Sequence, residues 1–352
     1  MTRRELLMAA GSAALFSSVA NAAPVVPNPN GRRGVGAAPA GFGQRVRANR
    51  AATPPVDWIE YCHSLGFGAV ETQVPPTTPE EIASMRDKIQ TYDMHVIFNV
   101  RLPQNAADLP AYEAGIKAVQ QVGGYGTHAA MTGRRYEVFN DFETFRKSFE
   151  QNKATIEMVE PILRKYKVKL AIENHKGWRS AEQAAWLKKL SSEYVGVHFD
   201  FGNNVSLCED PMMTLDNLLP YTFSGHIKDM SVQPDPNGFL LSEVVLGDGF
   251  LDLKTMVDKL RKKNPEMPLD IETITREPLK IPVYTSRYWV TFDDSYSPLP
   301  GRDLARVLEI VQKNPPKKPV PATAGLSPAA QLKLEDDNNM ASLIYARKNL
   351  GL

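Results

Sequence analysis

Three carboxylates and one imidazole in this chain follow short apolar runs at comparable intervals. The spacings between them are 27, 26 and 46 residues, and the last interval contains an insertion around residues 230–249. Carboxylate and imidazole donors favour Mn²⁺, Mg²⁺, Co²⁺ or Zn²⁺ over thiophilic metals, and such sites leave positions open for substrate oxygens. The pattern therefore predicts one divalent metal ion, with these ligands: Glu173, Asp200, His226 and Glu272.

The ligands require a scaffold that brings the ends of four strands together. From Asp57 onward the sequence alternates apolar strand-like runs with amphipathic stretches, which indicates parallel strands joined by helices. Seven strands are expected between Ala69 and Thr275, and a degenerate first strand within 35–46 makes eight. The strands are expected at 69–73, 94–100, 127–132, 168–174, 195–201, 223–229 and 269–275.

Eight such units predict an α/β fold, a single-domain (β/α)₈ TIM barrel with a C-terminal helical extension. Catalytic groups of this fold lie at the C-terminal ends of the strands, where the four ligands stand. A doubly wound open sheet is the alternative, but no G-x-G-x-x-G follows the early strands.

Four segments are expected along the chain. Residues 1–22 read as a signal peptide, and 23–55 as an N-terminal segment that contains the degenerate first strand. Residues 56–313 form the barrel, and 314–352 a Pro- and Lys-rich linker followed by a helix.

The N-terminus has the features of an export signal. Arg3 and Arg4 precede an apolar stretch that is too short for a stable membrane span, and Ala20–Ala22 offers small residues for a peptidase. The paired arginines resemble a twin-arginine signal, which exports folded proteins. A periplasmic or otherwise exported enzyme that starts near Ala23 is expected, with no stable membrane span after the signal is removed.

Composition narrows the partners. The 352 residues carry a formal net charge of +1, which gives no general attraction to nucleic acid, and none is expected as a partner. The two cysteines do not form a disulfide framework. The C-terminal helix is compatible with a homo-oligomer contact or with bracing of the barrel.

The motifs around the four ligands resemble the xylose isomerase-like TIM barrel family. The resemblance covers roughly residues 55–280 and is carried by Ile172-Glu173-Asn174-His175, Phe199-Asp200-Phe201-Gly202-Asn203, Gly225-His226-Ile227-Lys228-Asp229 and Ile271-Glu272-Thr273. It includes Leu246-Gly247-Asp248-Gly249 as well. The family contains sugar isomerases, epimerases, lyases and metal-dependent abasic-site endonucleases.

The resemblance implies a divalent ion, most often Mn²⁺, and a catalytic role for two of its ligands. Glu173 and Glu272 would exchange a proton on the carbon next to a carbonyl held by the metal. The chain departs from the family's sugar epimerases at Asn203, where a His is usual, and at Lys228 and Asp229, where an Arg is usual.

Further site residues follow from strand parity, because side chains two apart on a strand share a face. His175 and Lys228 are expected as catalytic groups, and other residues are expected to contact the substrate. These substrate-binding candidates are His198, Glu71, Asn99, Arg101, Trp178 and Arg276.

Three functions fit these residues. The first is an exported, metal-dependent sugar isomerase or epimerase. The second is a lyase or hydrolase that expels an aglycone from a 3-keto-glycoside through the same enolate chemistry. The third is a non-catalytic carbohydrate-binding protein, which has no need of a complete ligand set. Abasic-site endonuclease activity is disfavoured, because that chemistry uses a three-metal cluster and a basic face.

Overall fold

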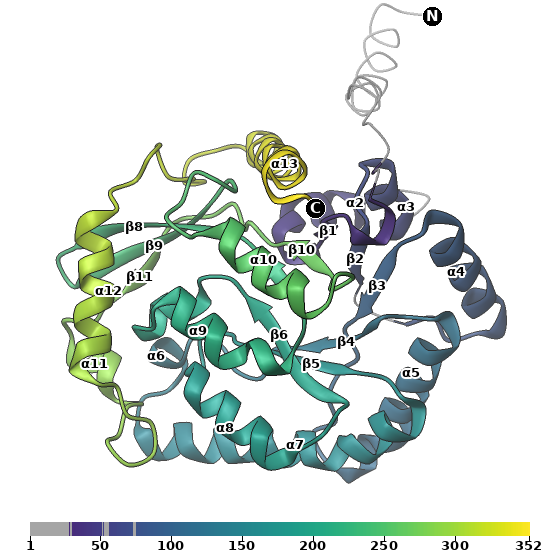
Figure 1. Cartoon of the computed structure of the whole chain (residues 1–352), viewed down its shortest axis with the longest axis horizontal. Coiled ribbons are helices and arrows are strands. Elements are labelled where there is room, and N and C mark those ends of the chain that lie inside the picture. The colour runs from purple at the N-terminus through teal and green to yellow at the C-terminus, as the bar shows by residue number, and fades with distance from the viewer. Residues whose placement is uncertain (1–27, 29, 51, 53–55, 73–74) are drawn as a thin grey trace, which may run out of the picture.

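The structure is a computed structural model that describes residues 28, 30–50, 52, 56–72 and 75–352 (Figure 1). The expected signal peptide lies outside the described residues. No described helix has the length and apolar character needed to cross a membrane.

Eight parallel strands close into a barrel, in the order β1-β10-β7-β6-β5-β4-β3-β2 (Figure 1). The closed barrel confirms the (β/α)₈ prediction and excludes the open sheet. Its first strand is as short as the sequence suggested. The strands are β1 (Gly36–Ala37), β2 (Ala69–Thr72), β3 (His95–Phe98), β4 (Gly126–Ala129), β5 (Leu170–Glu173), β6 (Val195–Asp200), β7 (Thr222–Ile227) and β10 (Leu269–Ile271).

Helices surround the barrel, and their apolar faces pack on the outside of the strands. Local signals fix several boundaries: Thr78 accepts a hydrogen bond from Glu81 N at 3.2 Å, and the Glu81 carboxylate accepts one from Thr78 N at 3.1 Å. This reciprocal cap starts α4. The helices up to β10 are α2 (Gly43–Arg50), α3 (Trp58–Ser64), α4 (Pro79–Tyr92), α5 (Leu109–Val122), α6 (Arg135–Val138), α7 (Phe142–Tyr166), α8 (Ser180–Leu190), α9 (Pro211–Leu218) and α10 (Leu253–Lys263).

A small antiparallel sheet stands beside the barrel. The insertion after β7 forms the hairpin of β8 (Asp229–Asp235) and β9 (Gly238–Val244), and β11 (Leu279–Ile281) pairs with β9. Its apolar side chains form a second core with helices α11 (Ser286–Trp289) and α12 (Gly301–Lys313). The sequence does not predict this sheet, because β8 and β9 fall almost entirely within the insertion around residues 230–249.

The C-terminal helix α13 (Pro328–Tyr345) packs against α2 and the turn after β1 (Figure 1). Its Glu335 carboxylate accepts hydrogen bonds from Gln44 N and Arg45 N, both at 2.8 Å. Asn339 donates to Gly41 O at 2.8 Å. Gly41 in turn packs on Glu272, since a Cβ at Gly41 would lie 3.0 Å from Glu272 Cα. The extension therefore braces a loop that touches an expected metal ligand.

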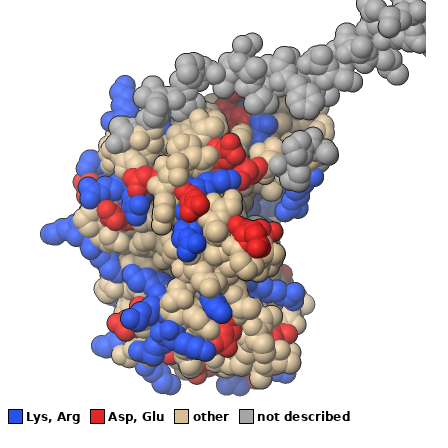
Figure 2. Space-filling view, turned by 90° about the vertical axis from the view of Figure 1, so that its right-hand side faces the viewer, with Lys and Arg blue, Asp and Glu red and all other residues tan. Residues whose placement is uncertain are grey.

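Basic and acidic side chains are interspersed over the face of the molecule in Figure 2, without one sign covering it.

Candidate metal centre

The four predicted ligands come from four neighbouring strands of the barrel. Glu173 ends β5, Asp200 ends β6, His226 is the penultimate residue of β7, and Glu272 directly follows β10. Because these strands are adjacent, the side chains form an arc with the two glutamates at its ends. All four are buried, with between 1 and 7% of each residue exposed.

Two atoms of this arc have no hydrogen-bond partner within the described chain. These are Asp200 Oδ1 and His226 Nδ1. His226 Nδ1 lies 3.4 Å from Glu272 Oε1 without forming a good hydrogen bond. Buried polar atoms are normally satisfied, so an orphaned carboxylate oxygen and an orphaned imidazole nitrogen in one arc fit a bound cation.

Asn203 holds two of the carboxylates in place. Gly202, with φ of +76°, turns the chain after β6 so that Asn203 lies beneath the arc. The Asn203 amide donates to Glu173 Oε1 at 3.0 Å and also to Asp200 Oδ2. The position at which this chain departs from the family's epimerases therefore supports the ligands directly.

Lys228 neutralises one side of the arc. Its ammonium donates to Asp200 Oδ2 at 2.8 Å and to Glu272 Oε2 at 2.7 Å, and Glu243 Oε1 lies 3.8 Å away. Lys228 is 1% exposed, and the nearby carboxylates hold its pKa well above the ordinary value even though burial acts in the opposite direction. The ammonium thus occupies the oxygens that face away from the orphaned atoms.

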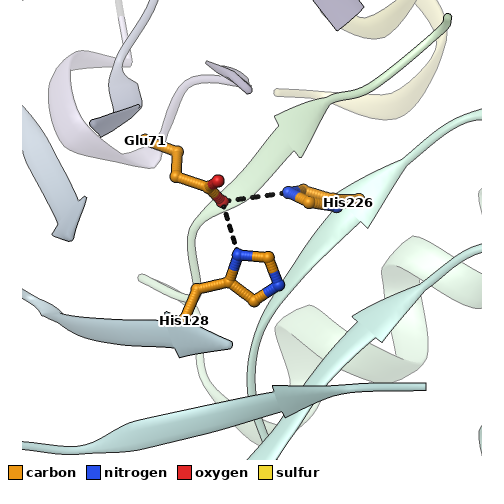
Figure 3. Close-up of side chains that lie close together, drawn as sticks. All are labelled: Glu71, His128 and His226. Atoms are coloured by element: carbon orange, nitrogen blue, oxygen red, sulfur yellow. Dashed lines mark hydrogen bonds and ion pairs between the residues drawn. The ribbon is translucent and has the colours of Figure 1, made fainter. Parts of the chain in front are cut away.

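Glu71, at the end of β2, organises the other side (Figure 3). Its Oε2 accepts a hydrogen bond from His226 Nε2 at 3.0 Å, and His128 Nδ1 on β4 lies 3.2 Å from the same oxygen. His128 Nε2 donates to Glu173 Oε2 at 3.2 Å. Since Nε2 of His226 is held by Glu71, Nδ1 is the nitrogen left to bind a metal.

The crowding of negative charge shows in the pKa of Asp200. Burial raises that pKa well above its ordinary value, and the charges of Glu272 and Glu173 raise it further, while Lys228 acts in the opposite direction. A cation bound between these carboxylates would relieve the repulsion. The donors of Glu173, Asp200 and His226 therefore fit a divalent ion, and Glu272 borders them, with its Oε1 3.4 Å from His226 Nδ1.

A second grouping of possible ligands overlaps the first. Glu71, His128 and His226 lie close enough together to hold an ion, as do Glu173, Asp200 and His226. Both groups need His226, whose Nε2 is hydrogen-bonded to Glu71. The first group is therefore better explained as the support that orients His226.

The structure brings several of the expected substrate-binding residues to the centre. Glu71 lies within it, and Asn99 donates to Glu71 Oε1 at 2.8 Å. His198 lies inside the barrel, where its ring centroid is 4.1 Å from that of His226 and its Nδ1 is 2.8 Å from Ser224 Oγ.

Other expected residues lie in different surroundings. His175 Nδ1 lies 2.5 Å from Thr132 O, Arg276 donates to Glu243 at 2.7 Å, and Arg101 is exposed. The expectation that Trp178 offers a ring to a sugar is corrected. Its indole is 1% exposed and packs 4.1 Å from Phe149 and 5.3 Å from Trp186, centroid to centroid, because the loop after β5 folds back onto α7 and α8.

Asp229 explains the glycine-rich loop Leu246–Gly249. Its carboxylate accepts hydrogen bonds from Gly247 N at 3.0 Å, Gly249 N at 2.9 Å and Leu251 N at 3.2 Å. Asp229 therefore fixes the chain after β9, whereas its neighbour Lys228 contacts the metal centre.

Sequence reasoning missed His128, Lys176 and Glu243 as parts of the site. His128 lies on a strand of only four residues, Gly126–Ala129, whose alternation is too short to fix a face. Strand parity would have found it if the strand had been placed one residue earlier.

The comparisons with known proteins agree with this architecture. The model of the xylose isomerase-like TIM barrel family matches residues 59–289. An uncharacterised protein of Escherichia coli K12, YihM, is 28% identical over 89 residues, which cover 25% of this chain and only 27% of that protein.

Solved structures with the same fold share little sequence with the chain. A D-psicose 3-epimerase from Clostridium cellulolyticum H10, solved with D-tagatose, is 14% identical with a TM-score of 0.50, covering 80% of this chain and 99% of its own. A xylose isomerase-like protein from Mycobacterium smegmatis in complex with magnesium is 15% identical with a TM-score of 0.50, covering 80% and 97%. Because the family model spans well over half of its residues, the chain belongs to the xylose isomerase-like TIM barrel family.

Proposed function

We propose that this protein is a divalent-metal-dependent sugar isomerase or epimerase, with Mn²⁺ as the preferred ion. The observation that carries the proposal is the arc itself. Two glutamates stand at its ends, and two orphaned ligand atoms, Asp200 Oδ1 and His226 Nδ1, lie between them. The sugar epimerases among the structures of this fold are consistent with it.

The bound ion would polarise a sugar carbonyl and its neighbouring hydroxyl, which makes the adjoining C–H bond more acidic. Glu173 and Glu272 supply the carboxylates that remove and return the proton. Asn203 and His128 fix the Glu173 carboxylate, and Lys228 fixes that of Glu272. Proton transfer is efficient only when such groups are held in position.

Lys228 favours isomerisation over aglycone expulsion. A lyase needs an acid that gives its proton to the departing oxygen. The Lys228 ammonium is already bonded to two carboxylates, which hold its pKa well above the usual range despite burial. It is therefore a positioning cation rather than that acid. His175, the other expected catalytic group, has Nδ1 against a backbone carbonyl, so its Nε2 is the nitrogen left for proton transfer.

Deuterium exchange tests the proposal. The Mn²⁺-loaded protein is incubated in D₂O with a panel of neutral sugars, sugar acids and 3-keto-glycosides, and the products are analysed by mass spectrometry. One deuterium on a carbon next to a carbonyl is expected for at least one compound, and Glu173→Gln and Glu272→Gln each abolish it.

Glu143→Gln is the control, because Glu143 is exposed on α7 beside Arg146 and should leave exchange unchanged. Aglycone release without exchange would establish the lyase instead. Binding of sugars with neither reaction would leave a carbohydrate-binding protein.

We also propose that the protein is exported through a twin-arginine-type signal. The support is the sequence of residues 1–22, with Arg3-Arg4 before an apolar stretch. The expected mature protein begins at Ala23, and replacement of both arginines by lysine blocks its export. An unprocessed N-terminus in the periplasmic fraction would contradict this.

A further inference from the structure

Lys176 is a buried cation without a carboxylate partner. Four cationic side chains of Lys or Arg type are buried in the described part of the chain, and three of them lie within 4 Å of a carboxylate oxygen. Lys176, 3% exposed, does not take part in any ion pair of that length among the described residues. Buried charges are normally paired, because an unpaired one loses its hydration without compensation.

The Lys176 ammonium has donors to spare. It donates to Asn203 Oδ1, which leaves two of its three N–H groups without an acceptor among the described residues. The same Asn203 amide donates to Glu173 and Asp200. Lys176 is therefore linked to the metal ligands through the side chain of Asn203.

The carboxylates of the centre do not satisfy Lys176 because other groups hold them. Lys228 takes Asp200 Oδ2 and Glu272 Oε2, and Arg276 takes Glu243 Oε1. Burial lowers the pKa of Lys176 to about 8, and the like charge of Lys228 contributes to the shift. The charges of Asp200 and Glu243 act on that pKa in the opposite direction, so what the ammonium offers an added anion is its two unused N–H groups.

We propose that Lys176 binds a carboxylate of the substrate, so that this enzyme acts on a sugar acid. This inference rests on the proposed function, since it assigns a substrate class to that site. A single ammonium beside an amide suits a carboxylate better than a phosphate, which is usually held by several N–H donors.

Calorimetric titration of the Mn²⁺-loaded protein with matched pairs tests the inference. The probes are D-galacturonate against D-galactose and D-glucuronate against D-glucose, with D-glucose 6-phosphate as the phosphate. We expect each uronate to bind at least about tenfold more tightly than its neutral partner, as one added charge-assisted contact allows.

The variant Lys176→Met should reduce uronate affinity to that of the neutral sugar and leave the neutral sugar unaffected. Lys176→Arg, which keeps the charge, should retain a part of the preference. Equal binding of uronate and neutral sugar by the wild type would overturn the inference, and so would tighter binding of the phosphate. A preference that survives Lys176→Met would also overturn it, because the metal alone would then select the carboxylate.

The two proposals fail separately. Deuterium exchange on neutral sugars alone, unchanged in Lys176→Met, would refute the sugar-acid substrate and keep the isomerase. Selective uronate binding without any exchange would keep the Lys176 subsite and refute the isomerase. The wild-type comparison decides the first point even if Lys176→Met does not fold.

Discussion

The two sides of the metal centre hold their carboxylates by different means. On the imidazole side, defined by Glu71, His128 and His226, neutralisable rings orient one another around one glutamate (Figure 3). On the ammonium side, defined by Asp200, Lys228 and Glu272, a permanent cation lies between two acids. The imidazole side directs a ligand atom toward the ion, whereas the ammonium side competes with the ion for negative charge. Removal of the supporting group on each side, Glu71 or Lys228, should therefore change metal affinity in opposite directions.

The largest effect is expected from Asp200, a proposed ligand on the ammonium side. Asp200→Asn removes a charge and reorients the orphaned oxygen, so Mn²⁺ affinity should fall by more than about 100-fold, beyond the range known for outer groups. Equilibrium dialysis measures the loss, and Glu143→Gln, at an exposed carboxylate, should bind as the wild type does. Similar affinity in Asp200→Asn would show that the ion binds elsewhere.

Loss of the ammonium should weaken the fold but strengthen metal binding. Without metal, Lys228→Met leaves Asp200 and Glu272 buried and unpaired, and the free energy of unfolding should fall by about 3–5 kcal/mol. Urea denaturation with EDTA and with Mn²⁺ measures this, and Mn²⁺ should recover part of the loss. Weaker Mn²⁺ binding in Lys228→Met than in Lys228→Arg would break the proposed competition.

On the imidazole side, substitution should lower Mn²⁺ affinity, in contrast to Lys228→Met, and the change should be smaller than for Asp200→Asn. Glu71→Gln no longer holds the Nε2–H of His226 as a charged acceptor, and Mn²⁺ affinity should fall by about 10–100-fold. His95→Gln is the control, since His95 lies at the start of β3, at the other end of the barrel. If both variants bind Mn²⁺ as the wild type does, Glu71 does not orient the ligand.

The smallest effect is expected at the other end of the barrel, where a histidine lacks a carboxylate such as Glu71. Burial lowers the pKa of His95, at the start of β3, to about 4, and the charge of Arg32 contributes. In the unfolded chain a histidine has a pKa of about 6.5, so the unfolded state binds more protons between these values. The stability is therefore present above about pH 6.5 and lost as the pH falls toward 4.

The difference in unfolding free energy between wild type and His95→Gln should shrink by on the order of 1–2 kcal/mol over that range. Thermal and urea denaturation at several pH values measure it. A difference that is constant with pH would show that His95 stays equally protonated in both states.

Much of the barrel was predictable because its signals are local. The strand ends that carry Glu173 and Asp200 follow apolar runs. The start of α4 is marked in the sequence by the capping residue Thr78. The hairpin of β8 and β9 was missed because antiparallel strands inside an insertion have no helix between them to set a period. Their presence depends on packing against α12, which lies far along the chain.

The four metal ligands remain a prediction, and the contacts around them could not be predicted from the sequence. Strand parity places Lys228 and Glu71 inward. It does not predict that Lys228 bonds two carboxylates or that Glu71 contacts two histidines. Lys176 follows β5 in a loop, where parity does not apply, and only its burial and lack of an ion pair distinguish it. Trp178 shows the reverse error, because a loop position suggested exposure and the fold buried it.

The number of Mn²⁺ ions per chain tests the central claim most directly. Equilibrium dialysis, followed by elemental analysis of the full protein, should give one ion per wild-type chain and none in a double variant of Asp200→Asn and Glu272→Gln at the same free Mn²⁺. Glu143→Gln should keep the ion. No bound ion in the wild type, or an unchanged ion in the double variant, would contradict the account, and two ions would contradict the single-ion centre.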